Sequence, residues 1–563
     1  MKKRIVIAEY VSTGYNMVYD VLSRGYEPVL LDCPYVAEQA DLADFHAGRE
    51  AVRARLPKGL IHIPENPDYS AVLEQVRALH TILVIAGSEF GVPYATRLAA
   101  DLDLPGNPVD RLKAMTEKDS MHQALKEYGI RYIRGQVITT IEEARAYYHE
   151  LNTEHVVVKR VRGVGTQGVY LCKGLAEVLA AVEKELNAGV LSGGDVVALL
   201  MQERIIGTEY IVNTVSCNGR HRVASIWQYD KVKMANGTNA YNYAQTVNKL
   251  DIGHSRLVSY AFDVLDAIGI KYGPVHGEFM IDEHGPVLIE VNCRPMGGGM
   301  SRKFVEQLFG HHETDCALDA YLNPDKFEEE LNKPYRPLRK GAMKFFILPR
   351  DVAAETTPIV PISKRLKSFH KGLFDRVGRE LLITQTKNLE TTGGMVYLIH
   401  PDEQVVIDEC NLLHTIEMKY PDILFQQTSE SDGASVPRAD IVAIMKEMRC
   451  GGGTLVFSDT GVQVEGATVI SEKELRDAYD SYEQGILDLS KPETFADLEI
   501  VIRQIYEFAD KIRENGRIII PESTYANLPY GMEGMEILLR ITGLRIETPR
   551  AGMKNVLVAS IER

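Results

Sequence analysis

The stretch His276-Gly-Glu-Phe-Met-Ile-Asp-Glu-His-Gly-Pro-Val-Leu-Ile-Glu-Val-Asn-Cys-Arg-Pro295 alternates like two strands joined by a short turn. With a three-residue loop at Glu283–Gly285, a common hairpin length, Glu278 lies directly opposite Glu290. Asn292 follows two residues later and projects from the same face of its strand. The sequence therefore predicts a β-hairpin that carries two opposed carboxylates and one amide on a single face.

The two opposed carboxylates require a counter-charge. Like charges directly across a ladder repel each other, and the apolar neighbours of these residues indicate a largely buried sheet. Two carboxylates and an amide form an oxygen-only ligand set, which suits a hard ion such as Mg²⁺ that completes its shell with water and substrate phosphates. Glu278, Glu290 and Asn292 are therefore candidate metal ligands at a nucleotide-phosphate site.

Length and composition describe a large globular protein. At 563 residues the chain is too long for one hydrophobic core and should contain about three to five domains. A net charge of −15, without a basic run, argues against nucleic-acid binding. Seven scattered cysteines, no C-x-x-C pair and no apolar run of membrane-spanning length predict a cytoplasmic chain without a membrane segment.

The order of apolar and polar patterns predicts an α/β multidomain protein. The N-terminal segment alternates strand patterns (Arg4–Ala8, Pro28–Leu31, Thr81–Ala86) with helical ones, which is typical of a small domain with a parallel sheet. Residues 230–250 are polar and aromatic without a clear period, and we expect a mobile loop there. The predicted domains are 1–108, 109–200, 201–332, 333–428 and 438–563.

A lysine and a glycine-rich segment follow one another after residue 155. A β-branched run reaches Lys159, and three glycines in six residues follow at Gly163, Gly165 and Gly168, with Thr166 and Gln167 between the last two. Such a loop lets backbone amides approach a phosphate, while the lysine supplies a point charge. The alternative is an ordinary hairpin with an exposed lysine.

Several further residues are candidates for ligand contacts. Gln202, Glu203 and Ile205 follow an apolar strand, where an extended linker can offer backbone groups to a base edge, and Glu209 can accept hydrogen bonds from ribose hydroxyls. The alternative for this segment is a solvated turn between strands. Lys118 lies on a helix after a turn, and taken alone it is a solvent-facing lysine.

Candidate substrate contacts surround the end of the hairpin. Arg294 follows Asn292, and an arginine beside a metal–phosphate site can stabilise a transferring phosphoryl group or hold a carboxylate. The alternative is a structural ion pair with one of the two hairpin glutamates. Gly297 and Gly298 let the backbone approach a ligand closely. His276 faces the same side as Glu278, and we expect a substrate contact rather than a base.

Taken in order, these segments resemble the ATP-grasp superfamily of carboxylate–amine ligases over roughly residues 1–425. The resemblance implies an N-terminal α/β domain, central and C-terminal grasp lobes with antiparallel sheets, and a lid subdomain. It implies that Lys118 and Lys159 contact ATP phosphates beneath the 163–168 loop. It also implies a set of ligand contacts: Gln202, Glu203 and Ile205 at adenine, Glu209 at ribose, Glu278, Glu290 and Asn292 at two Mg²⁺ ions (or Mn²⁺), and Arg294 at the acyl phosphate or substrate carboxylate.

Within the superfamily, the segments around Glu278 and Glu290 look like the L-amino acid ligase branch, although Gln202 stands where that family often has glutamate. The resemblance implies a ligase that joins a carboxylate, expected to be an amino acid's, to an amine through an acyl phosphate, with release of ADP. Two alternatives are a nucleotide-binding scaffold in a biosynthetic complex and bicarbonate activation, as in biotin carboxylase relatives. We expect small-molecule substrates and a homodimer.

Residues 438–563 lie outside this resemblance. Their last strand patterns look like the end of a class I methyltransferase, but no complete glycine-rich cofactor loop precedes them. We therefore expect a non-catalytic domain on which a partner enzyme can dock.

Overall fold

The computed structural model describes residues 2–34, 39–161, 169–191, 198–234, 239–331, 333–353, 359–374, 382–386, 391–424, 454–458, 467–470, 482–489, 498–526, 528, 530–547 and 556–561. The chain folds into two compact units, one of Met1–Asp230 with Ala244–Gly341, and one of Lys231–Tyr243 with Ala342–Arg563. No predicted site residue falls in the second unit. In the described part of the chain, no helix combines the length and apolar character that a membrane crossing requires.

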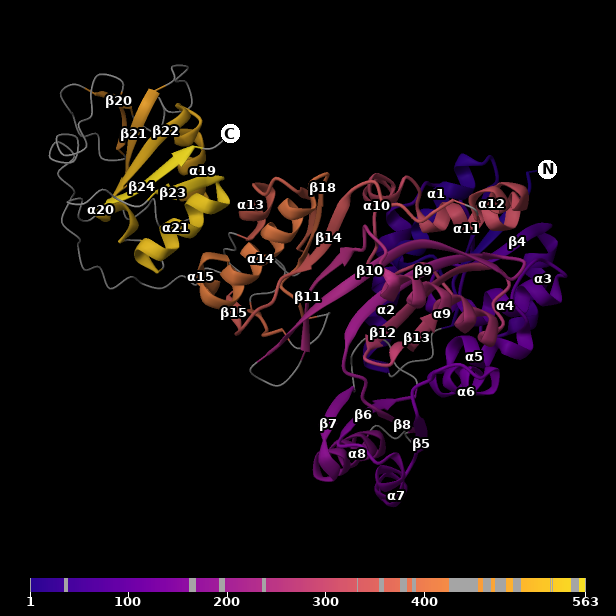
Figure 1. Cartoon of the computed structure of the whole chain (residues 1–563). Coiled ribbons are helices and arrows are strands. Elements are labelled where there is room, and N and C mark those ends of the chain that lie inside the picture. The colour runs from indigo at the N-terminus through magenta and orange to yellow at the C-terminus, as the bar shows by residue number, and fades with distance from the viewer. Residues whose placement is uncertain are drawn as a thin grey trace. The chain divides into compact units, whose positions relative to one another are not determined.

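The first residues form the predicted parallel sheet. Its strands are β1 (Arg4–Ala8), β2 (Glu27–Leu31), β3 (Ile61–Ile63) and β4 (Thr81–Ala86), in the order β3-β2-β1-β4 (Figure 1). Ile5 and Ile7 are buried on one face and Val6 and Ala8 on the other, as in parallel sheets covered on both sides. The helices that connect these strands are α1 (Tyr15–Ser23), α2 (Gln39–Arg55) and α3 (Tyr69–Ala78), and α4 (Val92–Asp101) follows β4.

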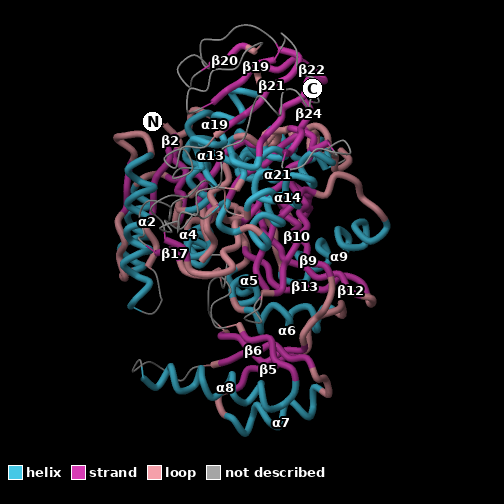
Figure 2. The backbone as a smooth tube through the Cα atoms, turned by 90° about the vertical axis from the view of Figure 1, so that its left-hand side faces the viewer, coloured by secondary structure: helices cyan, strands magenta, loops and turns pink. Residues whose placement is uncertain are grey.

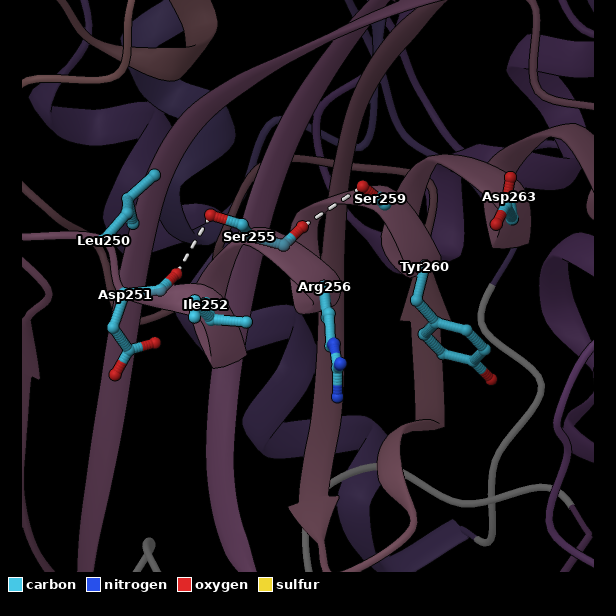
Figure 3. A pocket seen from close by; sticks show the side chains of 8 residues that line it. All are labelled: Leu250, Asp251, Ile252, Ser255, Arg256, Ser259, Tyr260 and Asp263. Atoms are coloured by element: carbon cyan, nitrogen blue, oxygen red, sulfur yellow. Dashed lines mark hydrogen bonds between the residues drawn. The ribbon is translucent and has the colours of Figure 1, made fainter.

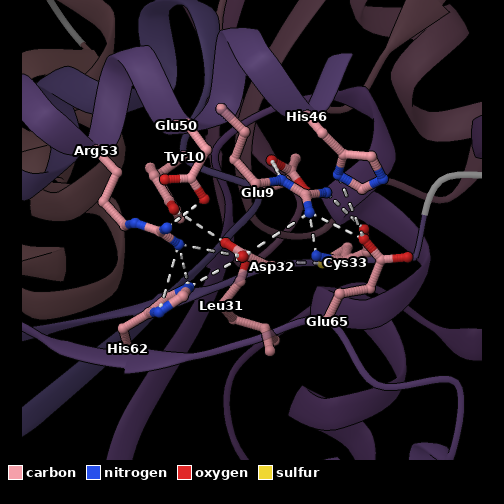
Figure 4. A network of polar contacts seen from close by, with 11 residues as sticks. Glu9, Tyr10, Leu31, Asp32, Cys33, His46, Glu50, Arg53, His62 and Glu65 are labelled. Atoms are coloured by element: carbon pink, nitrogen blue, oxygen red, sulfur yellow. Dashed lines mark hydrogen bonds and ion pairs between the residues drawn. The ribbon is translucent and has the colours of Figure 1, made fainter. Parts of the chain in front are cut away.

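A buried polar cluster holds the carboxyl ends of β1 and β2 to α2 (Figure 4). Glu9, which follows β1, is fully buried, and Arg49 donates to both of its oxygens, at 3.1 and 2.7 Å. The backbone N–H of Cys33 donates to the same carboxylate at 3.1 Å. Because its lone pairs are met by these donors, this carboxylate has a structural role.

The central lobe is a separate antiparallel sheet. Its order is β5-β8-β6-β7, with β5 (Gly135–Ile138), β6 (His155–Arg160), β7 (Tyr170–Lys173) and β8 (Leu199–Glu203). Helices α7 (Ile141–Leu151) and α8 (Gly174–Leu191) cover one face of this sheet (Figures 1 and 2). Val158 and Met201 pack against them, so the neighbouring Lys159 and Leu200 project from the opposite face.

A larger antiparallel sheet carries the hairpin of the opening sequence. Its strands in this unit neighbour one another in the order β13-β12-β9-β10, and helix α9 packs on β12 and β13. The strands are β9 (Thr208–Cys217), β10 (Arg220–Lys233), β12 (Gly273–Asp282) and β13 (Gly285–Asn292). The helices of this region and of the segment before β5 are α5 (Leu112–Thr116), α6 (Lys118–Tyr128), α9 (Ile252–Ile268), α10 (Arg302–Phe309), α11 (Glu313–Leu322) and α12 (Pro324–Leu331).

The predicted pairing of Glu278 with Glu290 is confirmed, but the predicted three-residue loop is wrong. Asp282 pairs with Gly285, so the loop contains only two residues. The register then shifts, because Phe279 pairs with Leu288 while Glu278 pairs with Glu290. Ile289 is therefore the extra residue of a β-bulge, which restores the pairing that a longer loop would give.

The mobile loop expected at residues 230–250 is also wrong for the described residues. Strand β10 continues to Lys233, and β11 spans Asn239–Thr246. The strand alternates strictly in burial, but its inward residues are small or polar: Ala240, Asn242, Ala244 and Thr246. A strand whose buried face lacks large apolar side chains gives no hydrophobic alternation to recognise.

The second unit contains the remaining elements. The strands up to residue 400 are β14 (Lys340–Phe345), β15 (Val352–Ala353), β16 (Phe369–Leu373), β17 (Leu382–Ile383) and β18 (Met395–His400), and the helices are α13 (Ile359–Lys364), α14 (Glu403–Lys419) and α15 (Pro421–Leu424). Lys344 and Glu417 are fully buried, and the lysine donates to both carboxylate oxygens at 2.7 Å. This ion pair joins β14 to α14.

The C-terminal segment forms a further sheet, in the order β20-β19-β21-β22-β24-β23. Strands β19 to β22 pair in parallel, and β24 is antiparallel to both of its neighbours. The assignment of this segment as methyltransferase-like stays a prediction. Its elements are β19 (Thr454–Ser458), β20 (Thr468–Ile470), β21 (Tyr482–Asp488), α19 (Leu498–Ala509), β22 (Ile512–Pro521), α20 (Glu522–Tyr525), α21 (Gly531–Ile541), β23 (Leu544–Glu547) and β24 (Val556–Ile561).

Candidate active site

The opposed acids lie on the face of the hairpin that receives two lysines. Lys118, the first residue of α6, places its Nζ 2.8 Å from Oε2 of Glu290. Asn292 donates from Nδ2 to Oε1 of the same carboxylate at 3.3 Å. Burial alone would raise the pKa of Glu290, but the charges of Lys118 and Lys159 and the hydrogen bonds from Lys118 and Asn292 together lower this pKa to about 2. Glu290 is therefore a carboxylate at any physiological pH.

Lys159 comes to this site from the central lobe. Its side chain is buried, and burial together with the charge of Lys118 lowers its pKa to about 8. Burial also disfavours the charge on Lys118, but Glu290 outweighs it and raises the pKa of that lysine. Two ammonium groups from different elements thus converge on the predicted metal acids, an arrangement that attracts a polyanion.

His276 is held by a chain of hydrogen bonds that starts on the neighbouring strand. It lies directly opposite Asn213, whose Oδ1 is 2.8 Å from His276 Nδ1. The amide of Asn213 donates to Ser225 Oγ at 2.8 Å, so its oxygen is the group that accepts from the imidazole. His276 Nδ1 therefore carries a proton, and Nε2 points to Glu278 Oε1 at 3.2 Å.

The alternative for Arg294 was an ion pair with Glu278 or Glu290. Among the described residues its side chain instead contacts Pro295 and Glu89. Its Nη1 donates to the backbone oxygen of Pro295 at 3.0 Å, and its Nη2 lies 3.5 Å from Oε2 of Glu89. Glu89 belongs to a short 3-10 helix, η2 (Glu89–Gly91), that follows β4 in the N-terminal domain. No local pattern in the sequence marks Glu89.

The backbone around Gly297 and Gly298 is clamped by the N-terminal domain. Thr13 donates from Oγ1 to the oxygen of Gly297 and accepts from the N–H of Met300, both at 3.3 Å. Asn16 donates to the oxygen of Met300 at 2.8 Å. Gly298 has φ +82°, a left-handed conformation that favours glycine. The segment that holds the two predicted substrate contacts is therefore fixed from outside its own lobe.

The predicted base-binding residues Gln202 and Glu203 end β8, and Ile205 follows it. Gln202 projects from the same face as Leu200 and Lys159, is buried, and its Nε2 has no hydrogen-bond partner among the described residues. Glu203 points the other way and accepts two bonds from the guanidinium of Arg134, at 2.9 and 2.7 Å, so its side chain is already occupied. An adenine contact at this position would have to come from the backbone.

The roles predicted for Ile205, Glu209 and the glycine-rich loop stay predictions. Ile205 and Glu209 are half-buried at the end of the linker and the start of β9. Gly163, Gly165, Thr166, Gln167 and Gly168 lie outside the described residues. Tyr229, which the sequence did not single out, is half-buried, and loss of solvent together with the charges of Glu278 and Glu209 raises its pKa well above the usual value.

A hollow of about 620 Å³ lies on the exposed side of α9 (Figure 3). The hydroxyls of Ser255 and Ser259 donate to helix backbone oxygens, and the apolar Ile252 is exposed. None of the predicted site residues lines this hollow.

Parts of this chain are similar in sequence to known proteins. The model of the ATP-grasp domain family matches residues 152–303. Dapdiamide A synthase of Enterobacter agglomerans is 27% identical over 360 residues, which cover 63% of this chain and 82% of that protein. The carbamoyl phosphate synthase large chain of Deinococcus radiodurans is 25% identical over 199 residues, covering 34% of this chain and 19% of that protein.

Solved structures show the same fold. The L-amino acid ligase from Bacillus licheniformis matches with a TM-score of 0.55 at 18% identity, covering 74% of this chain and 97% of that one. N5-carboxyaminoimidazole synthase from Aspergillus clavatus, in complex with ADP and 5-aminoimidazole ribonucleotide, matches with a TM-score of 0.53 at 12% identity, covering 74% and 99%. The chain has the ATP-grasp fold, and the predicted class, an ATP-dependent carboxylate–amine ligase, is confirmed.

Proposed function

We propose that this ligase joins the carboxylate of an amino acid to an amine, with ATP converted to ADP and phosphate. One observation carries the proposal: Glu278 and Glu290 face each other across the hairpin, with the ammonium of Lys118 2.8 Å from Glu290. Paired acids beside converging lysines suit a metal-bound triphosphate. The relationship to dapdiamide A synthase supports an amide as the product.

Glu278, Glu290 and Asn292 are the proposed metal ligands. The donor set fits, because all three offer oxygen, two of them as carboxylates that repel each other without a cation between them. Bound Mg²⁺, expected as two ions and replaceable by Mn²⁺, would neutralise charge on the phosphates of ATP. Lys118 and Lys159 would contact these phosphates, with the 163–168 loop above them.

The nucleoside end would lie along β8. Gln202 would donate from its unpartnered Nε2 to the base, since a buried donor without a partner is costly and a ligand acceptor removes that cost. The backbone of Glu203 and Ile205 would complete the adenine contacts, and Glu209 would accept from the ribose hydroxyls.

In the proposed reaction a carboxylate oxygen attacks the γ-phosphorus, and the bond to ADP breaks. The amine then attacks the carbonyl carbon of the acyl phosphate, loses a proton and displaces phosphate. Arg294 would hold the carboxylate and then the acyl phosphate, near the backbone of Gly297 and Gly298, and His276 would contact the substrate. No side-chain nucleophile is needed, because positioning and charge neutralisation lower the barrier.

A product screen tests the proposal. The full-length protein is incubated with ATP, Mg²⁺ and pooled amino acids, and products are identified by mass spectrometry. We expect a new amide together with ADP and phosphate in equal amounts. AMP and pyrophosphate would refute the acyl-phosphate route. ADP release that requires bicarbonate and no amine would favour the bicarbonate alternative, whereas nucleotide binding without turnover would favour a scaffold.

Two proposals concern assembly. Residues 438–563 would dock a partner enzyme rather than act on a substrate, and the chain would form a homodimer. Analytical ultracentrifugation of the full chain tests the second proposal, and co-purification with a chain truncated after residue 428 as the control tests the first.

A further inference from the structure

The N-terminal sheet has its topological switch point beside the proposed substrate site. In the order β3-β2-β1-β4, strands β2 and β3 lie on one side of β1, and β4 lies on the other side of β1. Open parallel sheets bind ligands outside the carboxyl ends of the strands at such a point. The loops that leave β1 and β4 cross closely there, since a Cβ on Gly14 would lie 2.3 Å from the oxygen of Gly87.

Ser88 and Glu89 occupy this switch point. Ser88 is 6% exposed, and its hydroxyl has no hydrogen-bond partner among the described residues. An unpaired buried hydroxyl costs about 1–3 kcal/mol, so this position favours a ligand that supplies a polar atom. Glu89 follows directly. Burial lowers the pKa of Lys118, but the negative charge of Glu290, and to a smaller extent that of Glu89, raises it. The carboxylate of Glu89 thus faces the same site from the opposite domain.

Glu89 and Arg294 present opposite charges next to each other, with Oε2 3.5 Å from Nη2. An α-amino acid carries its carboxylate and its ammonium on one carbon atom, so it offers the complementary pair at a similar spacing. When the guanidinium holds the carboxylate, the neighbouring ammonium needs an acceptor in a site from which water is excluded. The negatively charged carboxylate of Glu89 lies beside the guanidinium of Arg294 and can accept from this ammonium.

We propose that Glu89 binds the α-ammonium of the amino acid whose carboxylate Arg294 holds, so that this side chain selects amino acids over other carboxylic acids. The inference rests on the proposed function and adds a specificity-determining residue to it. An ion pair that only orients Arg294 would serve every carboxylate equally. The two roles therefore differ in how the protein treats acids that lack an amino group.

The test compares affinities for matched ligands by calorimetry, which needs no turnover. The probes are L-alanine with propanoate and L-valine with isovalerate, each with Mg²⁺ and a nonhydrolysable ATP analogue. For the native chain we expect a preference for the amino acid. In Glu89→Gln this preference should fall by roughly 10- to 100-fold, and Glu89→Asp should restore part of it. Glu74→Gln, an exposed residue of α3, is the matched control and should change nothing.

The outcomes separate the two proposals. If Glu89→Gln lowers the affinity for the amino acid and for its deaminated acid by the same factor, or lowers neither, the preference is unchanged and the proposed role of Glu89 is overturned. If instead the native chain forms no amide in the product screen, the proposed function itself fails. Circular dichroism of each variant excludes misfolding as the cause of a loss.

Discussion

Nζ of Lys118 lies 2.8 Å from Oε2 of Glu290, so one carboxylate is shared between a lysine and the proposed metal site. Breaking this pair should affect two ligands in opposite directions. In Lys118→Met the carboxylate is released, and Mn²⁺ should bind more tightly in the absence of nucleotide. The KM for ATP should rise by roughly 10- to 100-fold, because a charge-assisted contact to phosphate is lost. Calorimetry with Mn²⁺ and steady-state kinetics with ATP measure the two effects. If the variant bound both Mn²⁺ and ATP more weakly, or both more tightly, the proposed role of Lys118 would be contradicted.

Glu290→Gln tests the metal site directly. The variant keeps the shape of the side chain but loses the charge that opposes a cation, and we expect ADP release to fall by roughly 10²- to 10³-fold. Excess Mg²⁺ should recover part of the activity if the loss lies in metal affinity. Glu283→Gln, in the exposed turn of the same hairpin, is the control. Full turnover by the Glu290 variant would exclude this residue as a ligand.

The pKa of Lys159 predicts a pH-dependent stability. Burial and the charge of Lys118 lower this pKa from 10.5 to about 8, so between these values the folded chain binds fewer protons than the unfolded chain. Its stability should therefore rise with pH in this window, and the full cost of the buried charge should apply below about pH 8. Lys159→Met should stabilise the chain at neutral pH by roughly 1–3 kcal/mol, remove the rise, and abolish ATP turnover. Urea unfolding at a series of pH values measures this, and a destabilised variant would contradict the prediction.

Lys344 and Glu417 predict a strong non-additivity in stability. Both are fully buried, so Lys344→Met alone leaves an unpaired carboxylate and should cost about 3–5 kcal/mol. The double variant Lys344→Met/Glu417→Leu should recover much of this loss, because no charge remains buried. The recovery should be incomplete, since Glu417 also accepts the N–H of Ile347 at 3.1 Å. Denaturant unfolding of the three variants gives the coupling energy, and additive losses would argue against an isolated buried pair.

The hairpin could be predicted because its information is local. Alternation and turn residues placed Glu278 opposite Glu290, and both lie within one short stretch. The turn itself was wrong, because a two-residue loop with a bulge at Ile289 and a longer loop without one give the same pairing at the acids. Strand β11 was missed because its buried face consists of small and polar side chains.

The residues that complete the site could not be predicted, because they come from distant segments. Thr13 and Asn16 contact backbone 284 positions further along the chain, and Glu89, which follows β4, meets Arg294, which follows β13. Asn213 is recognisable only after its strand is known to lie opposite His276. Each of these contacts depends on how separate elements pack, which no local period records.

The clamp of Thr13 and Asn16 on the segment beyond Gly297 means that the first hundred or so residues are not a detachable accessory. A chain that began after residue 108 would retain the acids and both lysines, yet it would lack the surface against which this glycine segment is set. Removing the N-terminal domain should therefore release this segment even though the acids and lysines remain in place.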